Sequence, residues 1–400
     1  MRSERSSPSG SKESTSQDVA DVAVIGAGWW SQGWHIPQLS RNTRANLVGI
    51  VDSASQPRSN LNPHLESLEA LARKYDTAVF SSVSDLLANT PTLDGVIVAT
   101  PHSTHYNIGK EIYDANRNRE KPIHILMEKP MTTNIEEAYQ LHQLVASRPE
   151  VSFLINHSAN YRSQTKAAHQ AVPQLGSLRH GSIFMASALS WIFEDPSNTG
   201  WNVPGPDMLG NGFAWGQSSH VLAWVFYVCP QLSPIEVYCR MTHSAATGAD
   251  VALSGTIICR DCHSDNEVIL SVAGTSLLPG NEHSDPPVGK QIQFKLYGED
   301  GAIIYCGDTR DENTGNLELR RVSMDGVVEL PVGPGFAFEN LETEHDGPES
   351  LQAFLDACVG KSTHVGADSL VGLKTVQVLD AMYRSHASGQ SEPVRHADAE

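Results

Sequence analysis

The sequence predicts an α/β protein in which a doubly wound parallel sheet precedes a C-terminal α/β domain with a large mixed, mostly antiparallel open sheet. A chain of 400 residues exceeds what one compact core usually holds, which favours two domains. Up to residue 150, short apolar runs alternate with helical patterns, as in parallel βαβ units. Beyond Val151 the apolar segments become β-rich. We therefore expect a disordered tail over 1–18, a first domain over 19–150 and a second domain over 151–395.

The strands expected in the first domain are apolar runs that stop abruptly at polar residues. The first two runs are 22–25 and 47–51, and two later runs, 95–99 and 123–127, end at Thr100 and Glu128. In an open parallel sheet the carboxyl ends of the strands line the ligand crevice, so both polar stops should border a ligand. Helices are expected over 68–74, over 83–87 after a cap at Ser82 or Ser84, and over 135–145 after a cap at Thr133 or Asn134.

The second domain shows strand patterns first and helical patterns last. Strands are expected over 181–185, 251–259 and 268–275, with a polar turn between the last two. The segment 278–289 is rich in Pro, Gly and charge, which is typical of an exposed loop. Apolar spacing over 351–355 and 370–382 predicts helices that pack on the sheet or on the first domain.

Composition argues against two classes of partner. The formal net charge is -18, whereas a nucleic-acid-binding protein needs a clustered surplus of Lys and Arg to displace counterions from phosphates. No apolar stretch approaches the roughly 20 residues that span a bilayer, so a membrane is not expected as a partner either. Hydrophobic residues make up 40% of the chain and charged residues 18%, which is sufficient for packed cores.

The cysteines and the first residues bear on the compartment. Six cysteines are scattered over a long chain, unlike the dense framework of a small secreted domain, so we interpret them as reduced thiols in the cytoplasm. Residues 1–17 are rich in Ser, include Glu4 and Glu13, and lack the apolar core of a signal peptide. A transit peptide is the competing interpretation, although such peptides avoid acidic residues.

A glycine loop directly follows the first strand. Gly26 and Gly28 stand in a Gly-Ala-Gly-Trp-Trp-Ser segment, which resembles the dinucleotide-binding fingerprint of a Rossmann domain. Gly26 permits the tight turn, Gly28 lets the backbone approach a pyrophosphate, and the following helix N-terminus offers unpaired amides. Ser31 replaces the usual third glycine, and a small residue is tolerated there because the position mainly limits helix packing.

An acidic residue ends the second strand. Asp52 can accept hydrogen bonds from ribose hydroxyls and repels a 2′-phosphate, which favours NAD over NADP. Arg58 leaves NADP open. Trp29 and Trp30 either cover the cofactor or pack on the sheet, and packing of at least one is expected.

Two motifs at neighbouring strand ends are more specific than the glycine loop. Thr-Pro-His-Ser-Thr-His spans 100–105, and Met-Glu-Lys-Pro spans 127–130. Together they resemble the Gfo/Idh/MocA family, the relatives of glucose-fructose oxidoreductase and inositol dehydrogenase. The resemblance continues through 160–162, 175–179 and 297–301. The residues that it places at the cofactor are Thr100, Pro101, His105, Glu128 and Lys129.

The resemblance implies hydride exchange between NAD, with NADP as the alternative, and a sugar, inositol or related polyol. It also implies that the open sheet makes contacts in a homodimer or homotetramer. Lys129 is the first catalytic candidate, because a lysine beside a nicotinamide can bond to the reacting oxygen and burial lowers the pKa of an amine toward neutrality. A surface lysine at the start of a loop is the alternative interpretation.

The second catalytic element of the family is an Asp followed four residues later by a His on one helix face. In the matching stretch His220 fits the histidine, but Gly216 stands in place of the Asp. Proton transfer would then depend on Lys129 and on His220, since a histidine with a pKa of ~6.5 exchanges protons at neutral pH. A structural histidine is the alternative for His220. The expected substrate-binding residues are Arg162, Trp201, Gln217 and His220, and Arg162 and Trp201 could equally be structural.

No metal site is expected. Cys259 and Cys262 have ligand spacing, but a structural zinc site needs a second pair of ligands and none follows at comparable spacing. The leading hypothesis is therefore an NAD-dependent dehydrogenase that acts on CH-OH groups. A non-catalytic dinucleotide-binding regulatory protein, favoured by Gly216, is the second, and a hydrolase or lyase that works by transient oxidation is the third. The sequence does not name the alcohol, because a few pocket contacts decide specificity.

Overall fold

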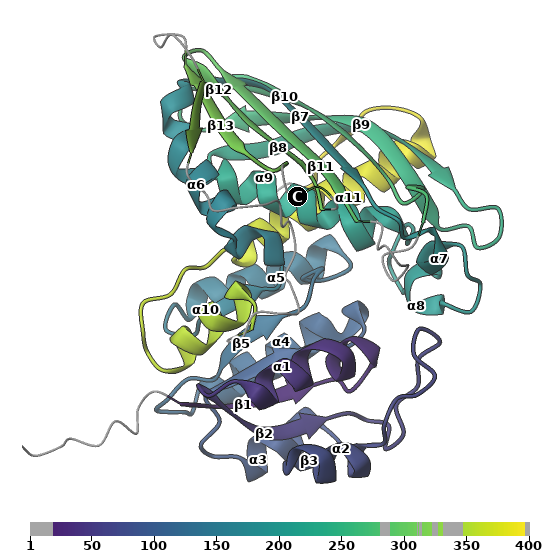
Figure 1. Cartoon of the computed structure of the whole chain (residues 1–400), viewed down its shortest axis with the longest axis vertical. Coiled ribbons are helices and arrows are strands. Elements are labelled where there is room, and N and C mark those ends of the chain that lie inside the picture. Colours follow the sequence, from purple (N-terminus) through teal and green to yellow (C-terminus); the bar gives the residue numbers. More distant parts are fainter. Residues whose placement is uncertain are drawn as a thin grey trace, which may run out of the picture.

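The structure is a computed structural model, and it describes residues 19–280, 289–309, 311, 314–321, 327–330 and 347–396. Two separate sheets are arranged one above the other, with helices between them (Figure 1). This confirms the predicted α/β class, with a parallel sheet first and a mixed, mostly antiparallel sheet second. The expected tail over 1–18 and the centre of the loop expected over 278–289 lie outside the described residues.

The first sheet has six parallel strands among the described residues, in the order β3-β2-β1-β4-β5-β6. The chain runs outward from β1 in one direction and returns to β4 in the other, so the crevice for a ligand lies beyond the carboxyl ends of β1 and β4. The strands are β1 (Ala20–Ile25), β2 (Ala45–Val51), β3 (Ala78–Phe80), β4 (Gly95–Val98), β5 (His124–Met127) and β6 (Phe153–Ile155).

Three helices of the first sheet start where the sequence predicts, at residues 68, 83 and 135. The side chains of Ser67, Ser82 and Asn134 each accept a backbone N–H of the first turn, at 3.2, 3.1 and 2.8 Å. Ser82 and Asn134 are thus the caps among the alternatives that the sequence left. The helices are α1 (Ile36–Arg41), α2 (Leu68–Tyr75), α3 (Val83–Asn89), α4 (His105–Asn116) and α5 (Ile135–Ser147).

The expected division at residue 150 does not follow the sheets. Strand β6 lies beyond it and pairs in parallel with β5, from Ile125 with Phe153 to Met127 with Ile155. Helix α10 (Glu349–Cys358) returns to the first sheet, where Phe354 and Leu355 share a core with Val22 and other residues of that sheet. Gly95 is needed under α10, because a Cβ there would lie 2.5 Å from Cys358 Sγ.

The second sheet has nine strands among the described residues, in the order β14-β13-β12-β11-β7-β10-β9-β8-β15. Strands β7 and β10 are parallel to each other, and the remaining neighbours pair antiparallel. The strands are β7 (Leu178–Ala186), β8 (Leu232–His243), β9 (Asp250–Asp261), β10 (Glu267–Thr275), β11 (Gln291–Gly298), β12 (Gly301–Asp308), β13 (Leu317–Arg321), β14 (Val327–Leu330) and β15 (Glu392–Pro393).

Helices cover the face of this sheet that looks toward the first sheet (Figure 1). Helix α9 (Ser219–Val228) is apolar on nearly all sides and almost wholly buried, as expected of a helix enclosed between layers. Its Trp224 ring stacks on Phe294 of β11 with centroids 3.9 Å apart. The other helices are α6 (Ser163–Ala171), α11 (Ser369–Ser388) and, at the end of the sheet, the short α7 (Ser190–Phe193) and α8 (Thr199–Asn202).

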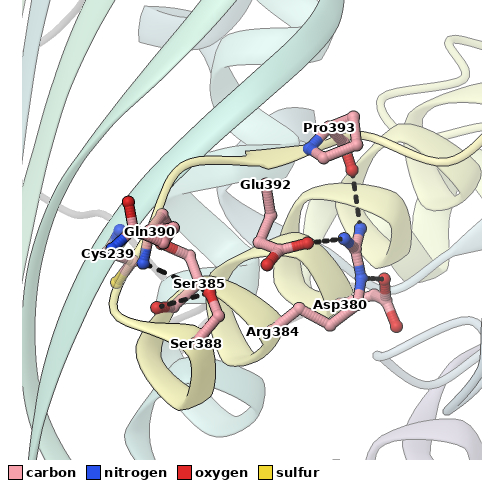
Figure 2. A network of polar contacts seen from close by, with 8 residues as sticks. All are labelled: Cys239, Asp380, Arg384, Ser385, Ser388, Gln390, Glu392 and Pro393. Carbon is pink, nitrogen blue, oxygen red and sulfur yellow. Dashed lines mark hydrogen bonds and ion pairs between the residues drawn. The ribbon is translucent and has the colours of Figure 1, made fainter.

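Strand β15 is fastened to helix α11 by a polar network (Figure 2). Arg384 of α11 contacts Asp380 at 2.7 Å, Glu392 at 2.8 Å and the carbonyl oxygen of Pro393 at 2.7 Å. Strand β15 thereby covers part of the exposed edge of β8, which would otherwise present unpaired backbone groups. Among the described residues, no helix combines the length and apolar character needed to cross a membrane.

Candidate active site

The glycine loop after β1 is closed toward the sheet and open on its other side. Gly26 has φ +99°, and a Cβ there would lie 2.5 Å from Ala99 O of the neighbouring strand end. A Cβ on Gly28 would meet nothing within 4 Å. A helical turn begins after Gly28, since Gln32 N donates to Gly28 O at 3.0 Å. The first backbone N–H groups of a helix have no acceptor within the helix. These residues fit a pyrophosphate, which binds open backbone at a helix N-terminus.

Asp52 holds the turn at the end of β2. Its Oδ2 accepts from Ala27 N at 2.8 Å, and its Oδ1 accepts from Ala54 N at 2.9 Å. The carboxylate is partly exposed beside the loop, whereas Arg58 is exposed farther along. The placement fits a ribose contact, and the assignment of Asp52 and the preference for NAD over NADP stay predictions.

Trp29 and Trp30 belong to an aromatic cluster beside the glycine loop. Trp30 stacks on Trp34 with ring centroids 5.5 Å apart, and it meets Trp29 edge to face at 5.4 Å. Trp30 nevertheless remains 38% exposed. Ser31 is fully buried, as expected of a small residue that replaces the third glycine.

Glu128 organises the end of β5. Its Oε1 accepts from Trp30 Nε1 at 2.9 Å, from Asn156 Nδ2 at 2.7 Å and contacts His35 Nε2 at 2.8 Å. Burial alone would raise the pKa of Glu128, but the hydrogen bonds and charge of its partners lower that pKa to about 2. The carboxylate is therefore ionised and fixes three elements of the crevice.

Lys129, at the end of β5, contacts residues that follow the first sheet in the sequence. Its Nζ donates to the carbonyl oxygen of Gly216 at 2.7 Å and lies 4.9 Å from the centroid of the Trp201 ring. Gly216 belongs to a π-helical turn, Ala214–Ser218, that leads directly into α9. The peptide bond between Lys129 and Pro130 is cis. Lys129 thus contacts Trp201 and Gly216, and its catalytic role stays a prediction.

Phe193 of α7 explains why position 216 is a glycine. A Cβ on Gly216 would lie 2.9 and 3.2 Å from Cζ and Cε1 of Phe193 and 3.4 Å from Cζ3 of Trp201. The space that a side chain at position 216 would need is therefore filled by aromatic rings. The backbone carbonyl of Gly216, in contrast, accepts a hydrogen bond from Lys129.

Three histidines surround the lysine. The rings of His157 and His220 meet edge to face with centroids 5.5 Å apart, and His102 lies 5.4 Å from the Trp201 ring. Burial, and then the charge of Lys129, hold the pKa of His220 well below its usual value. The expectation of an ordinary pKa for His220 is therefore wrong, and its imidazole is uncharged at neutral pH. Burial likewise lowers the pKa of His102 and His157 to about 3.

Other expected site residues have structural partners. His105 is buried, and its ring nitrogens contact Pro130 O at 2.8 Å and Thr100 O at 3.1 Å, which joins the two strand ends. Pro101 is exposed beside them. Arg162 forms an ion pair with Glu349 of α10, with 2.8 Å between Nη1 and Oε2. A substrate role for Arg162 stays a prediction that the ion pair does not favour.

Gln217 lies in the same π-helical turn as Gly216 and is buried. Its Oε1 is buried and has no hydrogen-bond partner among the described residues. Across the described part of the chain, no group of three or more His, Cys, Asp or Glu side chains is placed to hold a metal ion.

Sequence reasoning missed several residues that build this site. Asn156 and His157 follow the apolar run of β6, so the polar stop that identified the other strand ends could have identified them too. His35 and Phe193 carry no such signal, because each acts on a residue far away in the sequence. All four lie around Glu128, Lys129 or Gly216.

Comparisons with known proteins agree with this geometry. Residues 20–157 match the GFO_IDH_MocA model, an oxidoreductase family with an NAD-binding Rossmann fold. The chain is 27% identical over 307 residues to an uncharacterized oxidoreductase, sll0816, of Synechocystis, which covers 72% of this chain and 71% of the relative. It is 26% identical over 171 residues, 43% of this chain and 40% of the relative, to a putative UDP-kanosamine synthase oxidoreductase subunit of Amycolatopsis mediterranei.

The fold is also similar to that of the WlbA dehydrogenase from Bordetella pertussis, solved in complex with NADH and UDP-GlcNAcA. The TM-score is 0.63 at 20% identity, over 94% of this chain and 99% of that one. The family model, the glycine loop and the order of the first six strands identify the first sheet as an NAD-binding Rossmann fold. Residues 20–157 are thus similar to the NAD-binding Rossmann part of the Gfo/Idh/MocA oxidoreductase family.

Proposed function

We propose that this oxidoreductase interconverts a secondary alcohol and a ketone on a sugar, inositol or related polyol, with NAD as the hydride carrier. The observation that carries the proposal is the position of Lys129 Nζ, which contacts both Gly216 O and the Trp201 ring at the carboxyl edge of the Rossmann sheet. An ammonium group there can bond to the oxygen of an alcohol. The aromatic face of Trp201 can pack on a sugar ring.

The chain's own residues divide the work of binding and proton transfer. Bound NAD supplies the hydride acceptor, which is the part of the chemistry that side chains do not perform. The open loop at Gly28 would hold the pyrophosphate, and Asp52 the ribose. In alcohol oxidation the uncharged amine form of Lys129 would take the hydroxyl proton as the hydride leaves, and in the reverse direction its ammonium form would return that proton. The uncharged His220 would assist this proton transfer by accepting a hydrogen bond from the same hydroxyl.

The choice of a sugar or polyol draws on two relatives. The Amycolatopsis mediterranei relative is named for UDP-kanosamine synthesis, and the Bordetella pertussis structure is a complex with NADH and UDP-GlcNAcA. The buried acceptor on Gln217 and the neutral histidines suit a ligand with several hydroxyl groups, because each hydroxyl both donates and accepts. We further propose that the open face of the second sheet joins copies of the chain into a homodimer or homotetramer, which size-exclusion chromatography with light scattering would test.

The test is reduction of NAD and NADP by the purified protein over a panel of D-glucose, myo-inositol, UDP-N-acetyl-D-glucosamine and hydroxy acids. Lys129→Met should lower kcat by about 10²–10⁴ and leave NADH affinity within about threefold, because only proton transfer is removed. Lys121→Met is the matched control, since Lys121 pairs with Asp94 at the opposite edge of the sheet. It should leave both quantities unchanged.

Two other outcomes would contradict the proposal. NADH binding without turnover of any compound would favour the non-catalytic regulatory protein. Consumption of a substrate without net reduction of NAD would favour a hydrolase or lyase that works by transient oxidation, and product analysis would identify it.

A further inference from the structure

His157 is held rigidly at the carboxyl end of β6. Its backbone N–H donates to Ile155 O at 2.8 Å, and the preceding residue, Asn156, is fixed to Glu128 at 2.7 Å and to Met127 O at 2.7 Å. The side chain is only 1% exposed. The backbone at His157 is therefore held beside the contacts that position Glu128.

Both ring nitrogens of His157 lack a hydrogen-bond partner among the described residues. This is unusual for a histidine that serves only the core, because a buried polar group without a partner destabilises the folded state. His105 shows the usual arrangement: it is equally buried, but its two nitrogens contact two backbone carbonyl oxygens. His157 thus has hydrogen-bonding capacity that the described residues do not use.

The ring of His157 lies beside two residues of the proposed reaction site. The His157 ring meets His220 edge to face at 5.5 Å, and the charge of Lys129 acts on both rings. Burial, and then the charge of Lys129, lower the pKa of His157 to about 3, so the ring is neutral and carries one donor and one acceptor. A hydroxyl group, which also donates and accepts, is the complement of such a ring.

We propose that His157 is a substrate-binding residue that bonds to a second hydroxyl, on a carbon next to the one that is oxidised. This deepens the proposed function and rests on it. Lys129 and His220 take the reacting hydroxyl, and His157, beside His220, takes its neighbour. The site would then select vicinal diols over isolated secondary alcohols, because a substrate without the second hydroxyl leaves the buried imidazole without a partner.

The first experiment measures folding. His157→Leu should leave the free energy of unfolding unchanged or raise it, because the ring loses no hydrogen bond within the protein. His105→Leu is the matched control and should lower it, because two hydrogen bonds are lost. If His157→Leu destabilises the protein as much as His105→Leu does, His157 is a structural histidine and the proposal is overturned.

The second experiment measures binding and turnover. His157→Leu should keep the NADH affinity of the wild type but lower kcat/KM about 10- to 100-fold for D-glucose or myo-inositol, whichever the wild type oxidises. His157→Gln, which retains a donor and an acceptor, should restore part of that loss. The deoxy analogue that lacks the neighbouring hydroxyl should be oxidised equally well by wild type and His157→Leu.

The outcomes separate the two proposals. If the wild type oxidises neither compound nor any other on the panel, the proposed function fails. If the wild type turns over a polyol and His157→Leu does so with the same kcat/KM, only the role of His157 is overturned.

Discussion

The ring of Phe193 occupies the space into which a side chain at position 216 would point. A Cβ on Gly216 would lie 2.9 Å from Cζ of Phe193 and 3.2 Å from Cε1. Both distances are shorter than ordinary contacts between carbon atoms, which are about 3.5–4.0 Å. Overpacking of this size typically destabilises a protein by about 1–3 kcal/mol. Gly216 is helical, so Ala would also gain about 1 kcal/mol of helix propensity. We predict that Gly216→Ala lowers the free energy of unfolding by up to about 2 kcal/mol.

The effect of Gly216→Ala on stability should change sign when Phe193 is replaced by a smaller residue. Leu has neither of the two ring atoms that would clash, so Gly216→Ala in a Phe193→Leu background should stabilise by up to about 1 kcal/mol. The coupling between the two substitutions should then be about 1–3 kcal/mol. Gly33→Ala is the matched control, because Gly33 also lies in a π-helical turn and its Cβ would meet nothing within 4 Å.

Urea denaturation of the wild type, of Gly216→Ala, of Phe193→Leu and of the double variant measures the coupling free energy. The control should be stabilised by up to about 1 kcal/mol whether residue 193 is Phe or Leu. Effects of Gly216→Ala and Phe193→Leu that add within about 0.5 kcal/mol would refute the argument, because independent sites behave in that way. The claim that Phe193 replaces a side chain at position 216 would then be wrong.

Three further predictions concern the cofactor crevice and the end of the chain. Gly26→Ala should destabilise the fold by about 1–3 kcal/mol, because φ is +99°, whereas Gly28→Ala should keep the stability and weaken NADH binding, as denaturation and fluorescence titration would show. The pKa of the Glu128 carboxyl is lowered in the folded state, so its ionised form stabilises the protein above pH 4.5 by about 3 kcal/mol. This stabilisation should disappear as the pH falls toward 2. In acid denaturation, Glu128→Gln should lack this loss of stability. Arg384→Met should release β15 and speed hydrogen exchange at the amide of Val394, and unchanged exchange would contradict the role of the polar network.

The sequence predicts the parts of the site that local chemistry determines. Gly26 and Asp52 could be located because a tight turn requires a glycine and a strand end presents its polar residue to the crevice. Lys129 could be located in the same way, at the end of an apolar run. These features depend on neighbours in the sequence, so the parallel sheet and the crevice at the ends of its strands could be predicted from them.

Contacts between distant segments could not be predicted. His35 and Glu128 are 93 positions apart, and Lys129 and Gly216 are 87 apart, so no sequence spacing links them. The boundary at residue 150 was misplaced relative to the first sheet because β6 has only three residues. The low pKa of His220 was missed because burial depends on how α9 packs between the two sheets.

The central claim is that the glycine loop and the strand ends of the first sheet bind NAD for hydride transfer beside Lys129. A fluorescence titration of the purified protein with NADH and, separately, with NADPH tests it most directly. We predict saturable binding of both or of NADH alone, with NADH bound more tightly, because the Asp52 carboxylate at the end of β2 repels a 2′-phosphate. Saturation by neither dinucleotide would contradict the account of the site.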